Sequence, residues 1–489
     1  MKSKILNNSF NWLIILVVLL SACSLKNIFP PPTQPSISRQ PTHELITSLP
    51  TQTPDARRHV IIDADMGVDD SMAVLFLLKS KDITIMAITV AGTGLAHCNP
   101  GMRTALGLVA LTGNGNIPVA CGRETPLEGE ITFPQDWREE ADNLPKILGL
   151  PVSGELSDLS AAELLVSTIE AAPGKVTLFT SGPLTNIAEA LQINPELSDN
   201  IEMIYTMGGA LEVNGNVEDQ PSAEWNIYVD PVAAGLVFQS GVPITLIPLD
   251  ATNQVPITYR SRQAFEENLF TPAAEMAYKM IQETSLSLDI GVYFWDPLAA
   301  AILTDNTLGT LETHKLEVSQ SGEGIGSTIE SLQGIPMQVL RKVESDIFLE
   351  HFLSVLNDHA EVILPPEEDT ARVKIGTFFI SGKTCSYDGL FEIPAGRVSL
   401  DIIANVQEGD NALIIATVDE GIGLADIIAW NSCIQPPWGH VVSFFETSGI
   451  SEEQSELVFS VKEGQIFLVC YIGPDPCELF NALGPIEVK

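Results

Sequence analysis

Residues 59–78 read HVIIDADMGVDDSMAVLFLL, an apolar run that leads through an acidic octet into a second apolar run. The short β-branched run at 59–62 predicts a buried strand, and 71–78 predicts an amphipathic helix. Between them, Gly67 is expected to make the sharp turn, because glycine tolerates backbone angles that other residues avoid. A strand that passes directly into a helix is the repeating unit of α/β folds, so this stretch indicates the fold class.

The same alternation of strand and helix continues along the chain. Strands are expected at 83–90, 176–180, 201–207 and 243–248, and helices at 101–111 and 184–191. This pattern predicts an α/β fold with a mostly parallel open sheet and helices on both faces. Ligands of such sheets bind beyond the carboxyl ends of the strands, so the loops that leave those strands are the expected place for chemistry.

The pattern changes near residue 365. Residues 364–369 read LPPEED, which is typical of a linker, and strands then follow one another with little helix. They are expected at 398–406, 412–418, 456–461 and 465–471. We therefore predict an α/β domain over 58–365 and a smaller all-β sandwich domain over 370–489. The role of the second domain is open between binding a glycan, cell wall or partner and a purely structural role.

The start of the chain is typical of an export signal, with an apolar run at 12–20 followed by the small-residue box LSAC that ends at Cys23. The box resembles that of bacterial lipoproteins, which implies a lipid on Cys23. A transmembrane helix is the alternative, but a bilayer crossing needs about 20 apolar residues. We expect 1–23 to be a signal peptide, 24–57 a disordered Pro/Ser/Thr-rich linker, and the protein to be exported and lipid-anchored at the bacterial cell surface or envelope.

The composition bears on partners and on disulfides. The 25 Lys and Arg residues against 63 Asp and Glu give a net charge of -38, which disfavours nucleic-acid polymers and favours metal cations or small solutes. Apart from Cys23 the chain has six cysteines, an even number that permits disulfides in an exported protein. The sequence does not reveal their pairing, and association into a homo-oligomer is also open.

Four carboxylates stand within the octet: Asp63, Asp65, Asp69 and Asp70. Charges packed this closely repel one another, and a hard divalent cation is the usual counterion. The alternative is that Asp69 or Asp70 only caps the helix while the other carboxylates are solvated. The position at the carboxyl end of a strand favours the metal site.

Three further segments follow the octet in order. They are FTSGPLTN at 179–186; MGG at 207–209 with GN at 215–216 and AEWNIYVDP at 223–231; and WD at 295–296. Together with the octet, this ordered set resembles the inosine-uridine nucleoside hydrolase family over residues 58–365. The resemblance implies hydrolysis of the N-glycosidic bond of a ribonucleoside to ribose and free base.

The resemblance also implies a role for each matched residue. Calcium would be bound by Asp65, Asp70, the main-chain carbonyl of Thr180 and Asp296, all hard oxygen donors. Asp65 would in addition take a proton from a calcium-bound water directed at C1' of the ribose. The ribose contacts would come from Asp69, Met207, Asn216, Glu224 and Asn226. Such carboxylate and amide oxygens stabilise the positive charge that develops on the sugar. Taken alone, Glu224 and Asn226 would equally suit a surface turn, with Trp225 in the core.

The residues around the expected base site resemble the purine-preferring branch of the family. The segment FPQDWR at 133–138 and the segment YFWD at 293–296 carry Trp137 and Trp295, which that resemblance makes the two sides of a base sandwich. For Trp137, burial in the core is the alternative. One departure lies at 91–98, AGTGLAHC, where the family usually has Asn or Asp; His97 is either an acid for the leaving base or a solvated loop residue.

The expected function is therefore calcium-dependent hydrolysis of purine ribonucleosides. One alternative is a nucleoside-binding lipoprotein that acts as a solute receptor without hydrolysis, and another is a hydrolase of a different ribosyl compound. A receptor gains little from a general base beside a metal, so the octet together with Asp296 favours the enzyme.

Overall fold

The structure is a computed structural model that describes residues 57–151, 156–283, 292–365, 373–381, 384–406, 410–419, 421–430, 439–447, 451–461, 463–473 and 478–489. The predicted signal peptide with Cys23, nearly all of the predicted linker, and Cys433 and Cys477 lie outside these ranges. No helix within the described ranges combines the length and the apolar character that a bilayer crossing requires.

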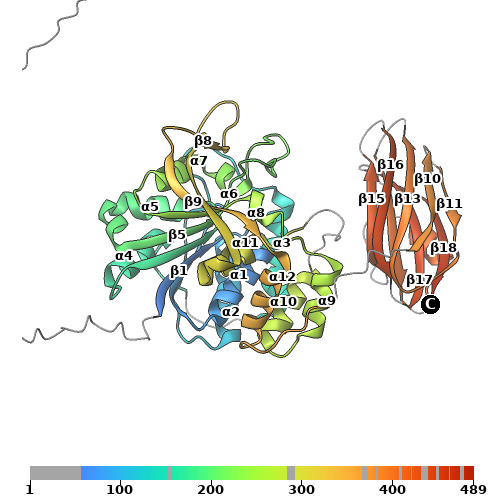
Figure 1. The fold of residues 1–489 in the computed structure, drawn as a ribbon, viewed down its shortest axis with the longest axis horizontal. Coiled ribbons are helices and arrows are strands. Elements are labelled where there is room, and N and C mark those ends of the chain that lie inside the picture. Colours follow the sequence, from blue (N-terminus) through green and yellow to red (C-terminus); the bar gives the residue numbers. More distant parts are fainter. Residues whose placement is uncertain are drawn as a thin grey trace, which may run out of the picture. The chain divides into compact units, whose positions relative to one another are not determined.

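A nine-stranded sheet forms the centre of the first part of the chain (Figure 1). Its order is β3-β2-β1-β4-β5-β6-β9-β7-β8. The strands are β1 (Arg58–Ala64), β2 (Ile83–Val90), β3 (Val119–Cys121), β4 (Val176–Ser181), β5 (Ile201–Met207), β6 (Ile244–Ile247), β7 (Gly309–Val318), β8 (Thr328–Glu330) and β9 (Ile335–Val343). All neighbours from β3 to β9 pair in parallel, and β7 runs antiparallel to both of its neighbours. The predicted mostly parallel sheet is confirmed.

Helices cover both faces of the sheet, as strand β1 shows. Val60, Ile62 and Ala64 belong to one hydrophobic cluster and Ile61 to another, because successive side chains of a strand point to opposite faces. The first cluster includes residues of α1 (Val68–Lys79), α2 (Cys98–Thr112), α3 (Gln135–Leu148), α8 (Leu249–Thr252), α9 (Tyr259–Glu267), α10 (Pro272–Glu283), α11 (Trp295–Thr304), η3 (Asn306–Leu308) and α12 (Ser345–Leu356). The second includes residues of α4 (Ala161–Ala171), α5 (Thr185–Ile193), η1 (Pro195–Asn200), α6 (Trp225–Val229) and α7 (Pro231–Phe238).

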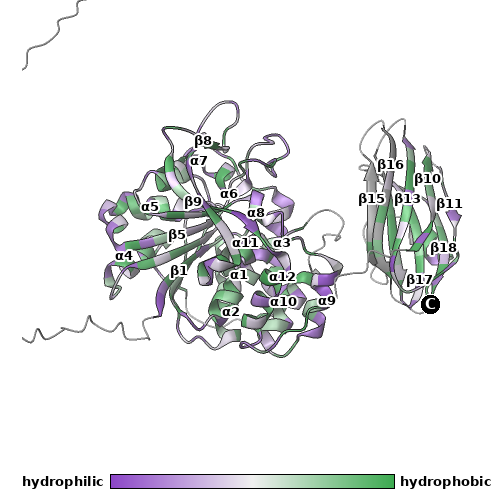
Figure 2. Cartoon of the chain, viewed as in Figure 1, coloured by the Kyte–Doolittle hydropathy of each residue, from purple (hydrophilic) through white to green (hydrophobic). Residues whose placement is uncertain are grey.

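Helix α1 differs from its prediction in one respect. It begins at Val68 and every residue from Asp70 to Leu78 is buried, so it is not amphipathic. Apolar residues dominate it (Figure 2). Helices α2, α10, α11 and α12 pack around it and leave no face of this stretch to solvent. The acidic residues Asp69 and Asp70 therefore lie in the first turn of a central helix.

The residues after 372 form two further sheets. One has the order β11-β10-β13-β16 and the other β12-β18-β17-β14-β15. The elements are β10 (Val373–Ser381), β11 (Thr384–Gly389), β12 (Glu392–Ile393), β13 (Gly396–Val406), β14 (Asp410–Val418), α13 (Leu424–Trp430), β15 (Gly439–Thr447), β16 (Ser451–Val461), β17 (Gly464–Gly473) and β18 (Glu478–Val488). Both sheets contribute to one hydrophobic cluster, and a disulfide between Cys385 and Cys470 joins them, as in a sandwich. The boundary expected near 365 to 370 falls partly on residues outside the described ranges and stays a prediction.

Candidate active site

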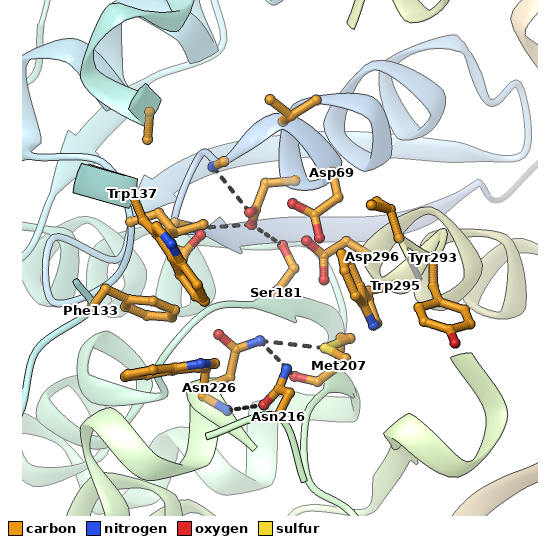
Figure 3. Close-up of a pocket in the computed structure, with 18 of the residues that line it drawn as sticks. Asp69, Phe133, Trp137, Ser181, Met207, Asn216, Asn226, Tyr293, Trp295 and Asp296 are labelled. Atoms are coloured by element: carbon orange, nitrogen blue, oxygen red, sulfur yellow. Dashed lines mark hydrogen bonds between the residues drawn. The ribbon is translucent and has the colours of Figure 1, made fainter. Parts of the chain in front are cut away.

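A pocket of about 350 Å³ lies at the carboxyl ends of β1, β4 and β5 (Figure 3). This is where open parallel sheets bind ligands. Ten of the residues singled out in the sequence line it together: Asp65, Asp69, Asp70, Trp137, Met207, Asn216, Glu224, Asn226, Trp295 and Asp296. Thr180 is buried in β4 and is not among the lining residues, although its neighbour Ser181 is.

The turn after β1 brings the carboxylates of the octet to the pocket. Its left-handed residue is Met66, with φ 63°, and not Gly67, whose backbone is extended. The predicted reason for Gly67 is thus wrong. A Cβ at Gly67 would lie 2.7 Å from the Cδ1 atom of Leu95 and 3.1 Å from Oδ2 of Asp70, so a larger residue there would push against these two side chains. The positive φ of a buried methionine is backbone strain at the site, and such strain concentrates at functional turns.

Three donors hold the Asp70 carboxylate. The main-chain N–H groups of Asp65 and Gly67 donate to it over 3.0 and 3.1 Å, and the Ser181 hydroxyl donates over 2.7 Å. These bonds join the turn, the start of α1 and the end of β4. Asp70 is therefore fixed by its structural contacts and does more than cap a helix.

Asp70, Asp69 and Asp296 form an acidic cluster. One carboxylate oxygen from each lies within 4.8 Å of the other two, and Asp296 comes from the first turn of α11. Burial, followed by repulsion from the neighbouring carboxylates, raises the pKa of Asp296 well above its usual value and that of Asp69 to about 7. These hard oxygens and their mutual repulsion suit a divalent cation.

Asp65 lines the same pocket beside Asp70 but does not belong to this group of three carboxylates. Its carboxylate is buried, and among the described residues its Oδ1 atom has no hydrogen-bond partner. Burial and then the charge of Asp70 raise the pKa of Asp65 well above the usual value. A buried acceptor without a partner is costly, so this oxygen fits contact with a cation or with a water that the cation holds.

Asp63 does not join this cluster. Its Oδ1 atom accepts hydrogen bonds from the Thr89 hydroxyl, over 2.6 Å, and from the Asn186 amide, over 2.7 Å. Burial raises the pKa of Asp63 to about 6 against the opposing effect of these two bonds. Only three of the four carboxylates in the octet face the pocket, because the fourth links β1 to β2 and α5.

Two residues predicted to hold ribose are buried at the start of α6. Glu224 is 2% exposed and Asn226 is 8% exposed, so a surface turn is wrong for both. The Glu224 carboxylate accepts main-chain hydrogen bonds from Gly209 and Asn226, each over 2.9 Å. The Asn226 amide donates to the Met207 carbonyl over 3.3 Å. Burial raises the pKa of Glu224, and the main-chain bonds oppose that shift.

Aromatic side chains form two walls of the pocket (Figure 3). Trp137 is 44% exposed, so it is not a core residue. It lies edge-on to Trp225 at 5.6 Å between ring centroids, and Trp225 stacks on Phe133 at 5.0 Å. Trp295 lies on the opposite side. Trp225 therefore lines the pocket, whereas the surface-turn alternative placed it in the core.

Further lining residues were not predicted from the sequence. Phe133 and Tyr293 stand within the quoted aromatic segments, which are the signal that could have identified them, whereas Glu140 on α3 carries no such signal. No histidine lines the pocket formed by the described residues. His97 instead pairs with Asp142 over 2.8 Å, so the structure does not support its role as an acid for the leaving base.

Comparison with known proteins agrees with this geometry. Residues 60–350 match the model of the inosine-uridine preferring nucleoside hydrolases. Uridine nucleosidase 1 of Arabidopsis thaliana is 32% identical over 274 residues, which are 55% of this chain and 81% of that protein.

Solved structures agree on the fold as well. The inosine-uridine preferring nucleoside hydrolase of Bacillus anthracis is similar with a TM-score of 0.55 and 28% identity, over 62% of this chain and 99% of that one. The purine-preferring ribonucleoside hydrolase of Gardnerella vaginalis has a TM-score of 0.53 and 29% identity, over 61% of this chain and 98% of that one. The chain therefore belongs to the inosine-uridine preferring nucleoside hydrolase family, the enzymes that hydrolyse the N-glycosidic bond of ribonucleosides.

Proposed function

We propose that this chain is a calcium-dependent hydrolase that prefers purine ribonucleosides, with Asp65 as the general base. The observation that carries the proposal is the meeting of Asp65, Asp70 and Asp296 in one pocket whose walls are aromatic. These carboxylates, with the carbonyl of Thr180, would hold the calcium ion. When bound, the ion would lower the pKa of a water molecule and orient it toward the sugar.

The residues of the chain carry the remaining steps. The Oδ1 atom of Asp65 is free to take the proton from the attacking water, because it accepts no hydrogen bond from the described residues. Glu224 and Asn226 hold the ribose hydroxyls, together with Asp69, Asn216 and the side chain of Met207. As the bond to the base breaks, positive charge develops on the sugar, and the surrounding carboxylates stabilise it.

The preference for purines rests on the aromatic walls. A purine between Trp137 and Trp295 gains more stacking than a pyrimidine, because its π face is larger. The lining residues that the structure describes include no histidine, and solvent reaches the half-exposed Trp137 side of the pocket, so the departing base takes its proton from solvent. Preference for uridine, as in the name of the Arabidopsis relative, is the second candidate.

Ribose release decides between these candidates. The chain is incubated with inosine, adenosine, guanosine, uridine and cytidine, with calcium and with a chelator followed by calcium. We expect release from the purine nucleosides, loss with chelator and recovery with calcium. Faster release from uridine would overturn the purine preference, and release that survives chelation would overturn the calcium dependence. Binding of nucleosides without release of ribose would favour a solute receptor.

We further infer that a lipid on Cys23 anchors the enzyme to the cell envelope. The support is the LSAC box with its preceding apolar run. Wild-type chain should partition with membranes after cell fractionation, and Cys23→Ser should lose the lipid mass. Recovery of unlipidated wild-type chain would contradict the anchor.

A further inference from the structure

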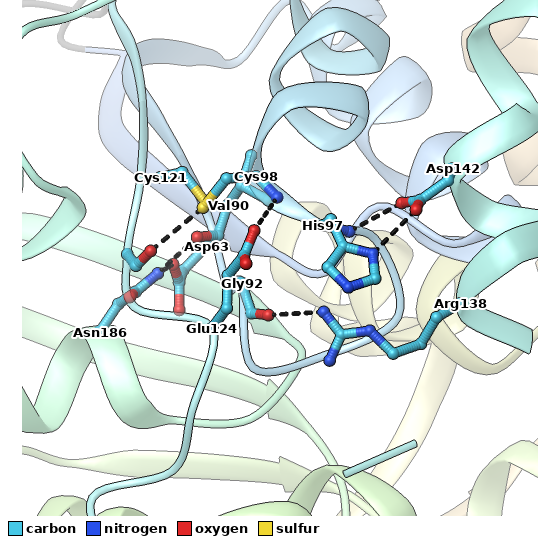
Figure 4. Close-up of a disulfide and its surroundings, with 11 residues drawn as sticks. Asp63, Val90, Gly92, His97, Cys98, Cys121, Glu124, Arg138, Asp142 and Asn186 are labelled. Atoms are coloured by element: carbon cyan, nitrogen blue, oxygen red, sulfur yellow. Dashed lines mark hydrogen bonds and ion pairs between the residues drawn. A yellow bond between two sulfur atoms is a disulfide. The ribbon is translucent and has the colours of Figure 1, made fainter. Parts of the chain in front are cut away.

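The turn between β2 and α2 packs against Asp65 on one side. On the other side it packs against the Cys98–Cys121 disulfide (Figure 4). A Cβ at Gly94 would lie 2.2 Å from the Cβ atom of Asp65, so the backbone of Gly94 packs directly against that side chain. Two residues earlier, a Cβ at Gly92 would lie 3.1 and 3.2 Å from the sulfurs of Cys98 and Cys121. A short path of contacts therefore leads from the disulfide through two glycines to Asp65.

Within the turn, the Gly94 N–H donates to the Ala91 carbonyl over 2.9 Å, and the Leu95 main chain hydrogen-bonds the Asp65 carboxylate. Main-chain hydrogen bonds anchor its ends to β1, from Ala91 to Ala64 over 3.0 Å and from Ala96 to Asp65 over 2.9 Å. In the middle, the Thr93 hydroxyl lies 3.1 Å from the Thr185 hydroxyl.

Helix α3 holds the other side of the turn. The Arg138 guanidinium donates to the Gly92 carbonyl over 3.0 Å, and Asp142 pairs with His97 over 2.8 Å (Figure 4). Helix α3 also carries Trp137 on the half-exposed wall of the pocket. The hydrogen bonds to β1 hold the two ends of the turn, whereas Arg138 of α3 holds its middle at the Gly92 carbonyl. The Cys98–Cys121 disulfide adds a covalent link to the sheet, because Cys121 is the last residue of β3.

We propose that the Cys98–Cys121 disulfide positions the general base by keeping the Gly92–Leu95 turn packed against Asp65. The inference rests on the proposed role of Asp65. The Oδ1 atom of that residue has no hydrogen-bond partner among the described residues, and the Leu95 main chain of the turn hydrogen-bonds the same carboxylate, so the turn bears directly on where the carboxylate lies. Gly182, which directly follows β4, encloses Asp65 from another side, since a Cβ there would lie 2.9 Å from the Cβ atom of Asp65. Displacement of the turn opens this enclosure and misplaces the carboxylate.

The first test is the double variant Cys98→Ser/Cys121→Ser, with Cys385→Ser/Cys470→Ser as the matched control. We expect the first pair to lower kcat about 10- to 100-fold, because misplacing a reacting group by about 1 Å can cost about 100-fold. The KM for the nucleoside should change little, since no ribose or base contact is removed. Hydrogen exchange of the amides of residues 91–97 should speed up. The control pair joins the two C-terminal sheets and should lower the thermal midpoint without changing kcat.

If the double variant does not fold, a second variant, Gly92→Ala, tests the same inference. In Gly92→Ala the new methyl group would crowd both sulfurs and, at 2.9 Å, the Arg123 carbonyl, so it displaces the turn while the disulfide stays closed. We expect the same fall in kcat. Its control is Gly174→Ala, where an added Cβ meets no atom within 4 Å.

Unchanged kcat in a folded Cys98→Ser/Cys121→Ser variant, or in Gly92→Ala, would overturn the inference, even if the thermal midpoint falls. Failure of the proposed function is distinguishable, because the unmodified chain would then release no ribose. In that case the positioning of Asp65 is tested by calorimetry, which measures the calcium dissociation constant of the unmodified chain and of the double variant. A weaker constant in the double variant supports the positioning of Asp65, and an unchanged one overturns it.

Discussion

Asp65 combines two features that define its chemistry at the scale of a residue. Its side chain is enclosed by Gly94 and Gly182, and its Oδ1 atom is buried without a hydrogen-bond partner among the described residues. The enclosure fixes the position of the carboxylate, and the unused oxygen can accept a proton. The neighbouring charge of Asp70 opposes ionisation of Asp65 unless a cation is present.

Asp65→Asn should separate activity from stability. The amide has the same shape and cannot take a proton, so kcat should fall about 100- to 10,000-fold. In the chelator-treated protein, the same change removes a repulsive buried charge and should raise the thermal midpoint. Initial rates of ribose release and thermal unfolding measure the two effects. A fall in both would indicate that the variant is misfolded and that its rate says nothing about the base.

Trp295→Ala should affect nucleosides according to the size of their base. Stacking of one base on an aromatic side chain contributes about 1–3 kcal/mol, so kcat/KM for inosine should fall about 10- to 100-fold. The fall for uridine should be smaller, and Trp295→Phe should retain part of the activity toward inosine. Equal losses for inosine and uridine would contradict the role of Trp295 in purine preference.

At the scale of an element, the loop after β5 is held by a residue outside the pocket lining. The Asp250 carboxylate in α8 accepts main-chain hydrogen bonds from Leu211 and Glu212, over 2.8 and 2.9 Å. It also pairs with Arg341 of β9 over 2.9 Å, and both side chains are largely buried. This loop leads from Met207 to Asn216, so Asp250 keeps a segment that lines the ribose side in place.

Asp250→Ala should therefore raise the KM for nucleosides more than it lowers kcat. It should also destabilise the protein by about 3 kcal/mol, because Arg341 loses the buried one of its two carboxylate partners and keeps only the exposed Glu212. The matched control is Glu212→Ala, which removes the other carboxylate paired with Arg341, one that is 73% exposed. Exposed pairs contribute about 0–1 kcal/mol. Urea unfolding and steady-state kinetics measure these effects, and equal destabilisation by the two variants would contradict the role of burial.

At the scale of the whole molecule, the buried carboxylates couple calcium, pH and stability. Without calcium, burial and mutual repulsion hold the pKa of Asp65, Asp69 and Asp296 above the values of an unfolded chain. Protonation therefore favours the folded state of the calcium-free protein. The stability that these groups contribute is fully present below the unfolded pKa of about 4 and is lost as pH rises through about 7, the folded pKa of Asp69.

The thermal midpoint of the chelator-treated protein should fall between pH 5 and pH 8 as these groups ionise. Saturating calcium should raise the midpoint most at pH 8, where all ligands are charged; an excess of about 100 times the dissociation constant contributes about 2.7 kcal/mol. The net charge of -38 also destabilises the folded chain as pH rises, through repulsion over the whole surface. Asp69→Asn is the control, because it removes one buried titrating group and leaves the surface charge unchanged. Removing one titrating group should flatten the slope near pH 7. An identical slope in the variant would place the effect elsewhere.

The sequence by itself determined the α/β class, the all-β C-terminal region and the segments that carry the site. The spacing of apolar residues that predicts a strand or a helix is a local property of the sequence. The acidic octet is likewise visible within eight consecutive residues. The order of the matched segments along the chain indicated the protein family. Because each matched segment carries its own site residues, the sequence alone predicted which residues hold calcium and ribose, from Asp65 to Asp296.

Only the tertiary structure decided which side chains face one another. Asp63 and Asp65 look alike in the octet, yet the bonds from Thr89 and Asn186 take Asp63 away from the pocket. The positive φ lies on Met66 and not on Gly67, whose backbone is extended. Trp225 lines the pocket because it stacks on Phe133 from a distant segment. Cys98 forms a disulfide with Cys121 because the fold brings their two segments together. Such contacts depend on how the chain closes on itself, which local sequence patterns do not encode.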